Sequence, residues 1–381
     1  MTNPHSLILN ALNDAVRDGV FPGAVLLVAF RGQIQIHQAV GFAVLMPRKV
    51  PLTRSTFFDL ASLTKPIATT AAVMRLVDRG VLKLDDRVNR WIPEFSGSEK
   101  DRIAVRDLLN HSSGLRAWEP LCKEAIKEAK NRIGFVGSSD AKRWVLNRIH
   151  RSRLVYKPGT QSLYSDLGFI LLGEVVERAV GLTLDRFCRE HVFRPLGLKR
   201  TFFIKTGTRR SGRFAATEQS DWRRRIVIGQ VHDDNAYVMG GIAGHAGLFG
   251  TAADLNRFAQ GMLEALRGRC SFVSQKTAKS FVSRQTTPGS SWALGWDTPS
   301  ESSGTPSSSG RFFSARSFGH LGYTGTSIWI DPEQDLVVVL LTNRVHPTSR
   351  NIKIRRFRPI IHDLIVQEIV PGGRPWSNRR G

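Results

Sequence analysis

Apolar residues recur along the chain at spacings that predict helices in some stretches and strands in others. Residues 7–16 place their apolar side chains on one side of a helix, and two apolar runs follow at 24–30 and 33–37. An Arg-Gly pair separates these runs, which predicts a β-hairpin. Near the other end of the chain, residues 328–330 and 336–341 flank an Asp-Pro-Glu-Gln-Asp turn and predict a second hairpin. The strand signals therefore lie at both ends of the chain.

The central part of the chain carries mainly helical patterns. An alanine-rich pattern runs over residues 67–77 and ends at Gly80, and a shorter pattern covers residues 103–111. Residues from about 120 to 150 are polar and helical in character, and a strongly apolar helix is predicted over residues 169–177. Helical patterns therefore fill the stretch between the two hairpins.

The first stretch with candidate chemistry covers residues 58–66, Phe-Asp-Leu-Ala-Ser-Leu-Thr-Lys-Pro. Ser62 stands near the start of the alanine-rich helix, and Lys65 follows three residues later, so both side chains project from one face of its first turn. A desolvated lysine can take the proton of a serine hydroxyl and activate it as a nucleophile. The helix N-terminus favours the negative charge that then develops. Ordinary helix capping by a serine explains the same spacing, so the rest of the chain must decide between the two.

The second candidate stretch contains Tyr164 and Asp166, in the loop between a Pro-Gly turn at residues 158–159 and the apolar helix. A tyrosine near an ammonium group can take and return a proton, and a short polar side chain two residues later can orient a lysine or a substrate amide. The alternative is that Asp166 caps the helix and Tyr164 packs in the core.

The third candidate stretch covers residues 318–327, Phe-Gly-His-Leu-Gly-Tyr-Thr-Gly-Thr-Ser, and leads into the second hairpin. Glycines at a strand edge, such as Gly322, let a substrate lie against the backbone, and an exposed N–H there can stabilise an oxyanion. His320 is a candidate polar partner for the substrate or its leaving group, although a single histidine is more often structural.

Composition narrows the class of protein. At 381 residues the chain suits two closely packed subdomains, and no stretch approaches the roughly 18 consecutive apolar residues of a membrane span. The first residues lack the basic and apolar regions of a secretory signal, so we expect a cytoplasmic protein. Three scattered cysteines without metal-ligand spacing are expected to be reduced, structural thiols.

A formal net charge of +23 is the strongest compositional feature. Such a charge is typical of proteins that bind an anionic partner, such as nucleic acid, a membrane surface or an acidic polymer. The basic residues are spread along the chain, however, and their clusters at 223–225, 353–356 and 374–380 belong to no recognisable nucleic-acid motif. We therefore expect solvated surface charge and no specific nucleic-acid partner, with a polyanion site as the alternative.

The three candidate stretches resemble, in their order and approximate spacing, the serine β-lactamase and penicillin-binding-protein superfamily. Ser-x-x-Lys is followed by Tyr-x-Asp, similar to the family's Tyr-x-Asn, and by His-x-Gly, similar to its Lys-x-Gly. The resemblance is closer to the β-lactamase-related serine hydrolases grouped with class C β-lactamases, D-alanyl-D-alanine carboxypeptidases and family VIII esterases. It extends from about residue 10 to about residue 365, and further segments that support it are residues 108–115, 195–198, 231–236, 244–249 and 294–297.

The resemblance implies a role for each candidate side chain. Ser62 would be the acylated nucleophile, and Lys65 and Tyr164 would form a coupled pair that transfers protons. The backbone N–H groups of Ser62 and Tyr323 would form the oxyanion hole.

Two positions depart from the β-lactamase pattern. Asp166 stands where a β-lactamase has asparagine, and His320 stands where it has the lysine of Lys-Thr-Gly. An ionised aspartate cannot donate a hydrogen bond to a lactam side-chain amide, and its charge favours a protonated Lys65. Histidine is a weaker, pH-dependent partner for a substrate carboxylate. These departures favour an esterase, or a peptidase or amidase acting on small acyl substrates, over efficient β-lactam hydrolysis.

The resemblance also implies an α+β fold of the β-lactamase/transpeptidase type, with residues 1–370 as the catalytic domain. An antiparallel sheet flanked by the first and last helices would comprise about residues 1–85 and 286–370. A mainly helical subdomain, about residues 86–285, would be inserted between them, and the active site would lie between the two parts. Residues 371–381 are expected to form a flexible basic tail.

The sequence thus predicts a serine hydrolase that forms an acyl-enzyme on small ester or amide substrates, with esters favoured. A D-amino-acid peptidase and a weak β-lactamase are alternatives that use the same residues. A non-catalytic binding or sensing module of the same fold is a further alternative, and the reactive side chains at all three stretches argue against it. We expect a small acyl substrate as the partner, no metal and no cofactor, and the oligomeric state is left open.

Overall fold

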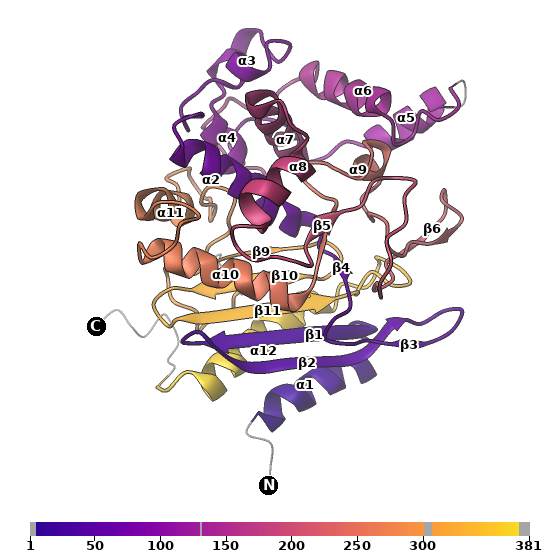
Figure 1. The fold of residues 1–381 in the computed structure, drawn as a ribbon, viewed down its shortest axis with the longest axis vertical. Coiled ribbons are helices and arrows are strands. Elements are labelled where there is room, and N and C mark those ends of the chain that lie inside the picture. Colours follow the sequence, from indigo (N-terminus) through magenta and orange to yellow (C-terminus); the bar gives the residue numbers. More distant parts are fainter. Residues whose placement is uncertain (1–4, 130–131, 301–306, 373–381) are drawn as a thin grey trace.

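A six-stranded antiparallel sheet lies in the lower half of the molecule as drawn in Figure 1. The computed structural model describes residues 5–129, 132–300 and 307–372, so the predicted basic tail lies almost entirely outside the described residues. In the order β3-β2-β1-β11-β10-β9, the strands are Val50–Pro51, Gln33–Val44, Gly23–Phe30, Leu336–Thr342, Ser327–Asp331 and Phe318–Leu321. The sheet therefore combines both ends of the chain.

Both predicted hairpins form, and they pair with each other at the centre of the sheet. β1 runs antiparallel to β11, so that Leu26 lies opposite Leu340 and Val28 lies opposite Val338. Successive side chains of a strand point to opposite faces, and both faces of these two strands are buried. This double burial explains why the two strands are apolar throughout and do not alternate with polar residues.

Two helices from opposite ends of the chain cover one face of the sheet (Figure 1). They are α1 (Ser6–Arg17) and α12 (Ile354–Ile369), and they pack against each other and against alternate residues of β1 and β11. On the other face, α10 (Ala252–Leu266) contacts β1, β10 and β11 through its apolar side. The predicted antiparallel sheet flanked by helices is confirmed, with the first and last helices together on one face. α10 covers the sheet although it belongs to the predicted helical subdomain, about residues 86–285. The division into two subdomains stays a prediction.

Most of the remaining helices form the upper part of the molecule in Figure 1. They are α2 (Ala71–Asp78), α3 (Val88–Trp91), α4 (Val105–Leu109), α5 (Leu121–Ala129), α6 (Ser139–His150), α7 (Asp166–Val180), α8 (Leu184–Cys188), α9 (Asp234–Val238) and α11 (Gln275–Val282). The first three turns of α7 are buried on every side, which explains why that segment is apolar all round. None of the helices that the structure describes combines the length and hydropathy that a membrane span requires. The three cysteines are free thiols.

Two small sheets accompany the large one. β4 (Phe58–Asp59), β8 (Leu248–Gly250) and β5 (Phe202–Phe203) form a three-stranded sheet, and β6 (Gln219–Ser220) pairs with β7 (Arg225–Ile226). β4 delivers the chain to Ser62, so the small sheet with β8 fixes the position of the first candidate stretch.

Candidate active site

Ser62 lies in a tight turn between β4 and α2. The sequence pattern predicts an ordinary α-helix from this point, but residues 61–63 form a single 3₁₀ turn and residues 65–70 a wider, π-helical turn. Side chains three residues apart eclipse one another in a 3₁₀ turn, and Lys65 Nζ donates a hydrogen bond to Ser62 Oγ at 3.0 Å. The predicted proximity of the two groups is therefore present, although the helix type differs.

The residue before the nucleophile candidate is strained. Ala61 has a φ of 47°, in the left-handed region that residues with a Cβ rarely adopt. The buried Asp59 carboxylate supports this turn, because it accepts the Ala61 N–H at 2.8 Å and the His232 N–H at 2.6 Å. Burial raises the pKa of Asp59, while these two hydrogen bonds oppose the rise. Strain of this kind concentrates at functional sites. Sequence reasoning missed Asp59, whose only signal was its position three residues before Ser62.

Lys65 is fully buried, and all three of its donors are used. Besides Ser62 Oγ, Lys65 Nζ contacts Asp166 Oδ1 at 2.6 Å and the His245 carbonyl at 3.2 Å. Burial alone would lower the pKa of Lys65, but the charge of Asp166 and hydrogen bonds with Asp166 and Tyr164 outweigh it and raise that pKa above its ordinary value. Lys65 therefore holds its proton at neutral pH.

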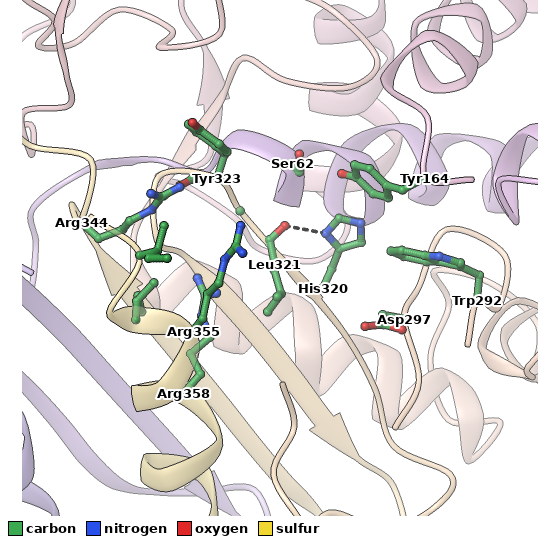
Figure 2. Close-up of a pocket in the computed structure, with 13 residues that line it drawn as sticks. Ser62, Tyr164, Trp292, Asp297, His320, Leu321, Tyr323, Arg344, Arg355 and Arg358 are labelled. Carbon is green, nitrogen blue, oxygen red and sulfur yellow. Dashed lines mark hydrogen bonds between the residues drawn. The ribbon is translucent and has the colours of Figure 1, made fainter. Parts of the chain in front are cut away.

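Tyr164 and Asp166 meet Lys65 from the start of α7. Ser165 caps the helix, because its Oγ accepts the Gly168 N–H at 3.1 Å, so the alternative of a capping role for Asp166 is wrong. The Tyr164 ring centre lies 4.8 Å from Lys65 Nζ, and Figure 2 shows the hydroxyl directed toward Ser62. Burial raises the pKa of Tyr164, while the Lys65 charge and hydrogen bonds with Lys65 and Ser62 oppose the rise. Tyr164 is therefore a neutral phenol at neutral pH.

The third candidate stretch packs directly against the Ser62 turn. Thr326 Oγ1 donates to the Leu60 carbonyl at 3.0 Å, and Thr324 Oγ1 donates to the Asp59 carbonyl at 2.8 Å. Gly322 permits this approach, since a Cβ at this position would lie 2.6 Å from the Leu60 carbonyl oxygen and 2.0 Å from Thr326 Oγ1. The glycine is therefore required by close backbone contact between the two motifs.

Tyr323 follows Gly322 at the mouth of the site. Its N–H donates to no acceptor among the residues that the structure describes, and the residue is 55% exposed. The Arg344 guanidinium holds the Tyr323 carbonyl with two hydrogen bonds of 2.9 and 2.6 Å. The peptide group before Tyr323 thus offers a free donor beside Ser62, while the following peptide is fixed.

His320 is neutral and buried. Its Nδ1 lies 2.8 Å from the Leu321 carbonyl (Figure 2), which assigns the proton to Nδ1, and its Nε2 has no partner among the described residues. Burial and the Lys65 charge lower the pKa of His320 to about 3. The expectation of a pH-dependent charge is therefore corrected: because desolvation keeps the ring uncharged near neutral pH, His320 offers a substrate a hydrogen-bond acceptor.

His111 is a site residue that sequence reasoning did not single out. Its ring centre lies 4.6 Å from that of Tyr164 and 4.5 Å from that of Trp292, and its Nδ1 accepts the Ser165 N–H at 3.0 Å. It therefore supports Tyr164 and the start of α7. Its signal was the Asn-His-Ser-Ser-Gly segment, which matched the family pattern without an assigned role.

A cavity of about 320 Å³ opens on Ser62, with three arginines on its wall (Figure 2). Arg344 is occupied by backbone carbonyls, but neither Arg355 nor Arg358 pairs with any carboxylate in the described part of the chain. Arg358 is 5% exposed, and its Nε has no partner there. Burial, Arg344 and Arg355 lower the pKa of Arg358 to about 9, so it remains charged at neutral pH. We expected the basic cluster at residues 353–356 to be solvated surface charge, but Arg355 of this cluster lines the cavity.

The fold and the Ser-Lys-Tyr cluster define the β-lactamase/transpeptidase-like class of serine hydrolases. The model of the Beta-lactamase family matches residues 10–360, and the chain belongs to this family. A protein of Escherichia coli (strain K12), named provisionally as a D-alanyl-D-alanine carboxypeptidase, is 36% identical over 353 residues, which cover 86% of this chain and 79% of that protein. A Salmonella agona (strain SL483) protein of the same name is 33% identical over 365 residues, which cover 88% of this chain and 82% of that protein. The chain is accordingly a serine hydrolase.

Solved structures of the same fold include three proteins of different description. EstCE1, a hydrolase with promiscuous acyltransferase activity, has a TM-score of 0.70 at 24% identity and covers 94% of this chain and 98% of its own. The octameric penicillin-binding protein homologue from Pyrococcus abyssi has a TM-score of 0.73 at 20% identity. The match covers 97% of this chain and 78% of that one. Simvastatin synthase (LovD) from Aspergillus terreus has a TM-score of 0.72 at 21% identity. The match covers 96% of this chain and 98% of that one. At these identities the likeness shows the fold.

Within the described residues, no group of histidine, cysteine and carboxylate side chains could hold a metal ion.

Proposed function

We propose that Ser62 is acylated by the substrate and that Lys65 and Tyr164 move the protons. The observation that carries this proposal is the buried Lys65 Nζ, which bridges Ser62 Oγ and Asp166 Oδ1. Lys65 and Tyr164 both hold protons at neutral pH, so the reactive form has lost one proton from this pair. That form takes the Ser62 proton as Ser62 Oγ attacks the substrate carbonyl. The pair then protonates the leaving group, and water releases the acyl group by the reverse steps.

The oxyanion would lie between the backbone N–H groups of Ser62 and Tyr323. Two observations support this placement. The Tyr323 N–H has no acceptor among the described residues, and the Arg344 guanidinium donates two hydrogen bonds to the Tyr323 carbonyl. Donors held in place before the reaction stabilise developing charge without a reorganisation cost, and each is worth about 3 kcal/mol. Asp166 would orient Lys65, and His320 would accept a hydrogen bond from the substrate.

Small esters are the first substrate class that we propose, because the departures at Asp166 and His320 remove groups that a β-lactam would use. A carboxypeptidase-like activity on short D-amino-acid peptides is the second. Arg355 and Arg358 favour it, since guanidinium groups without a carboxylate partner are suited to an anionic group of a substrate. The names of the curated relatives are in line with this class.

Covalent labelling tests the proposal directly. After exposure to a fluorophosphonate, mass spectrometry should find one adduct, on Ser62, and Ser62→Ala should lose both the adduct and the release of p-nitrophenol from short acyl esters. An adduct on another residue, or activity that survives Ser62→Ala, would overturn the assignment. Comparison of p-nitrophenyl esters, nitrocefin and D-alanyl dipeptides then separates the substrate classes. A combined Arg355→Ala and Arg358→Ala variant should raise KM for the dipeptide more than for a neutral ester.

A further inference from the structure

A second cavity, of about 770 Å³, also opens onto Ser62 and shares Tyr164 and Tyr323 with the arginine-lined one. Its wall carries the opposite charge. Five carboxylates line it, Asp166, Glu218, Asp221, Asp233 and Asp234, against the single lysine Lys123. In a chain with a net charge of +23, this acidic wall next to the nucleophile is a local reversal of charge.

Two of these carboxylates already have a cationic partner. Asp166 pairs with Lys65 at 2.6 Å, and Asp234 pairs with Arg223 at 2.5 Å. Asp221 is exposed, and its carboxylate contacts no side-chain partner among the residues described. One negative charge at the wall is therefore free.

Two further carboxylates pair with a histidine and with no lysine or arginine among the described residues. Glu218 Oε2 lies 3.0 Å from His232 Nε2, and Asp233 Oδ1 lies 3.0 Å from His245 Nε2. Burial would raise both pKa values, but hydrogen bonds with His232 and Ser349 hold the pKa of Glu218 at about 2, and His245 holds that of Asp233 below its ordinary value. Both groups are ionised at neutral pH.

A buried histidine and two exposed tryptophans line the same cavity. His245 is 1% exposed, and its Nδ1 has no partner in the described chain. Asp233 holds Nε2, so Nδ1 is the ring nitrogen left for a ligand. Trp118 and Trp222 lie at the wall with 49% and 39% of their surface exposed. Carboxylates and aromatic side chains together favour a cationic N–H donor.

We propose that this cavity binds an ammonium group carried by the acyl part of the substrate. The inference rests on the proposed function, since it requires acylation of Ser62. With the arginine-lined cavity beside it, the site suits a molecule that carries a cation on the acyl side and an anion on the leaving group. An unblocked short peptide or amino-acid ester has this chemistry.

Two p-nitrophenyl esters with the same number of heavy atoms, 6-aminohexanoate and heptanoate, test the ammonium site. We expect kcat/KM for the aminohexanoate to exceed that for the heptanoate about tenfold or more, after subtraction of the rate with Ser62→Ala. Asp221→Asn should lower this ratio and Asp221→Lys should lower it further, toward unity. Added salt should also lower it, because the attraction is screened. Asp18→Asn, which removes an exposed carboxylate at the end of α1, is the matched control and should leave the ratio unchanged.

The outcomes separate the two proposals. A ratio near unity in the native protein, with Ser62 acylated by both esters, overturns the ammonium site and leaves the proposed function standing. A high ratio that Asp221→Lys does not lower also overturns it, and thermal melting of this exposed-site variant confirms that it is folded. If mass spectrometry finds no Ser62 acylation with either ester, the proposed function fails and this inference fails with it.

Discussion

Replacement of Asp166 by asparagine isolates the effect of one negative charge on the reactive pair. Lys65 Nζ lies 2.6 Å from Asp166 Oδ1, and an asparagine Oδ1 can accept the same hydrogen bond. An opposite charge at such a distance shifts a pKa by about 1–3 units. We expect Asp166→Asn to lower the pKa of the Lys65–Tyr164 pair by about 1–2 units, or about 1.4–2.7 kcal/mol. Because the reactive form has lost a proton from this pair, the variant should become active at lower pH.

The measurement is kcat/KM for a neutral p-nitrophenyl ester from about pH 5 to about pH 9. The acid limb should move down by about 1–2 pH units, which makes the variant roughly 10-fold to 100-fold faster than the native protein below that limb, relative to its own plateau. The plateau should fall because a weaker base accepts the Ser62 proton less readily. Asp140→Asn, on an exposed part of α6, should leave the profile unchanged. An unmoved acid limb with a lower plateau would refute the reasoning, since Asp166 would then only position Lys65.

Three further predictions follow from distances and burial. Tyr164→Phe should slow single-turnover acylation by about 10²–10⁴-fold, and a loss of less than about tenfold would contradict a proton-transfer role. Gly322→Ala places a Cβ 2.0 Å from Thr326 Oγ1, so thermal melting should show destabilisation of about 1–3 kcal/mol. Burial raises the pKa of Asp297 from an ordinary 3.8 to about 6. The protonated carboxyl is therefore tolerated in the folded protein below about pH 4, and its ionisation destabilises the fold as the pH rises through 6. Urea unfolding should show that Asp297→Asn raises the free energy of unfolding by about 1–3 kcal/mol at about pH 8 and leaves it unchanged at about pH 4.

The Ser62–Lys65 pair could be predicted because it depends on local geometry. A spacing of three residues brings two side chains together in any helical turn, whether 3₁₀ or α. Tyr164 and Asp166, about a hundred residues away, were candidates because of their residue types and their place before the apolar helix, and the resemblance to a known family then linked them to Ser62. The roles of Asp59 and His111 could not be assigned from the sequence, because they depend on a strained backbone turn and on a ring packed beside Tyr164.

The Ser62 motif, the strands of both chain ends and the mainly helical character of the middle were determined by the sequence itself, since periodicity and short spacings are local properties. Tertiary structure decided the charge of the groups around Ser62. Burial and distant neighbours keep Lys65 protonated and His320 neutral. Folding also brings Arg358 and Asp221, which lie far from Ser62 in the sequence, into two cavities that open on it. The solvent exposure and neighbours that set these charges exist only once the chain is folded.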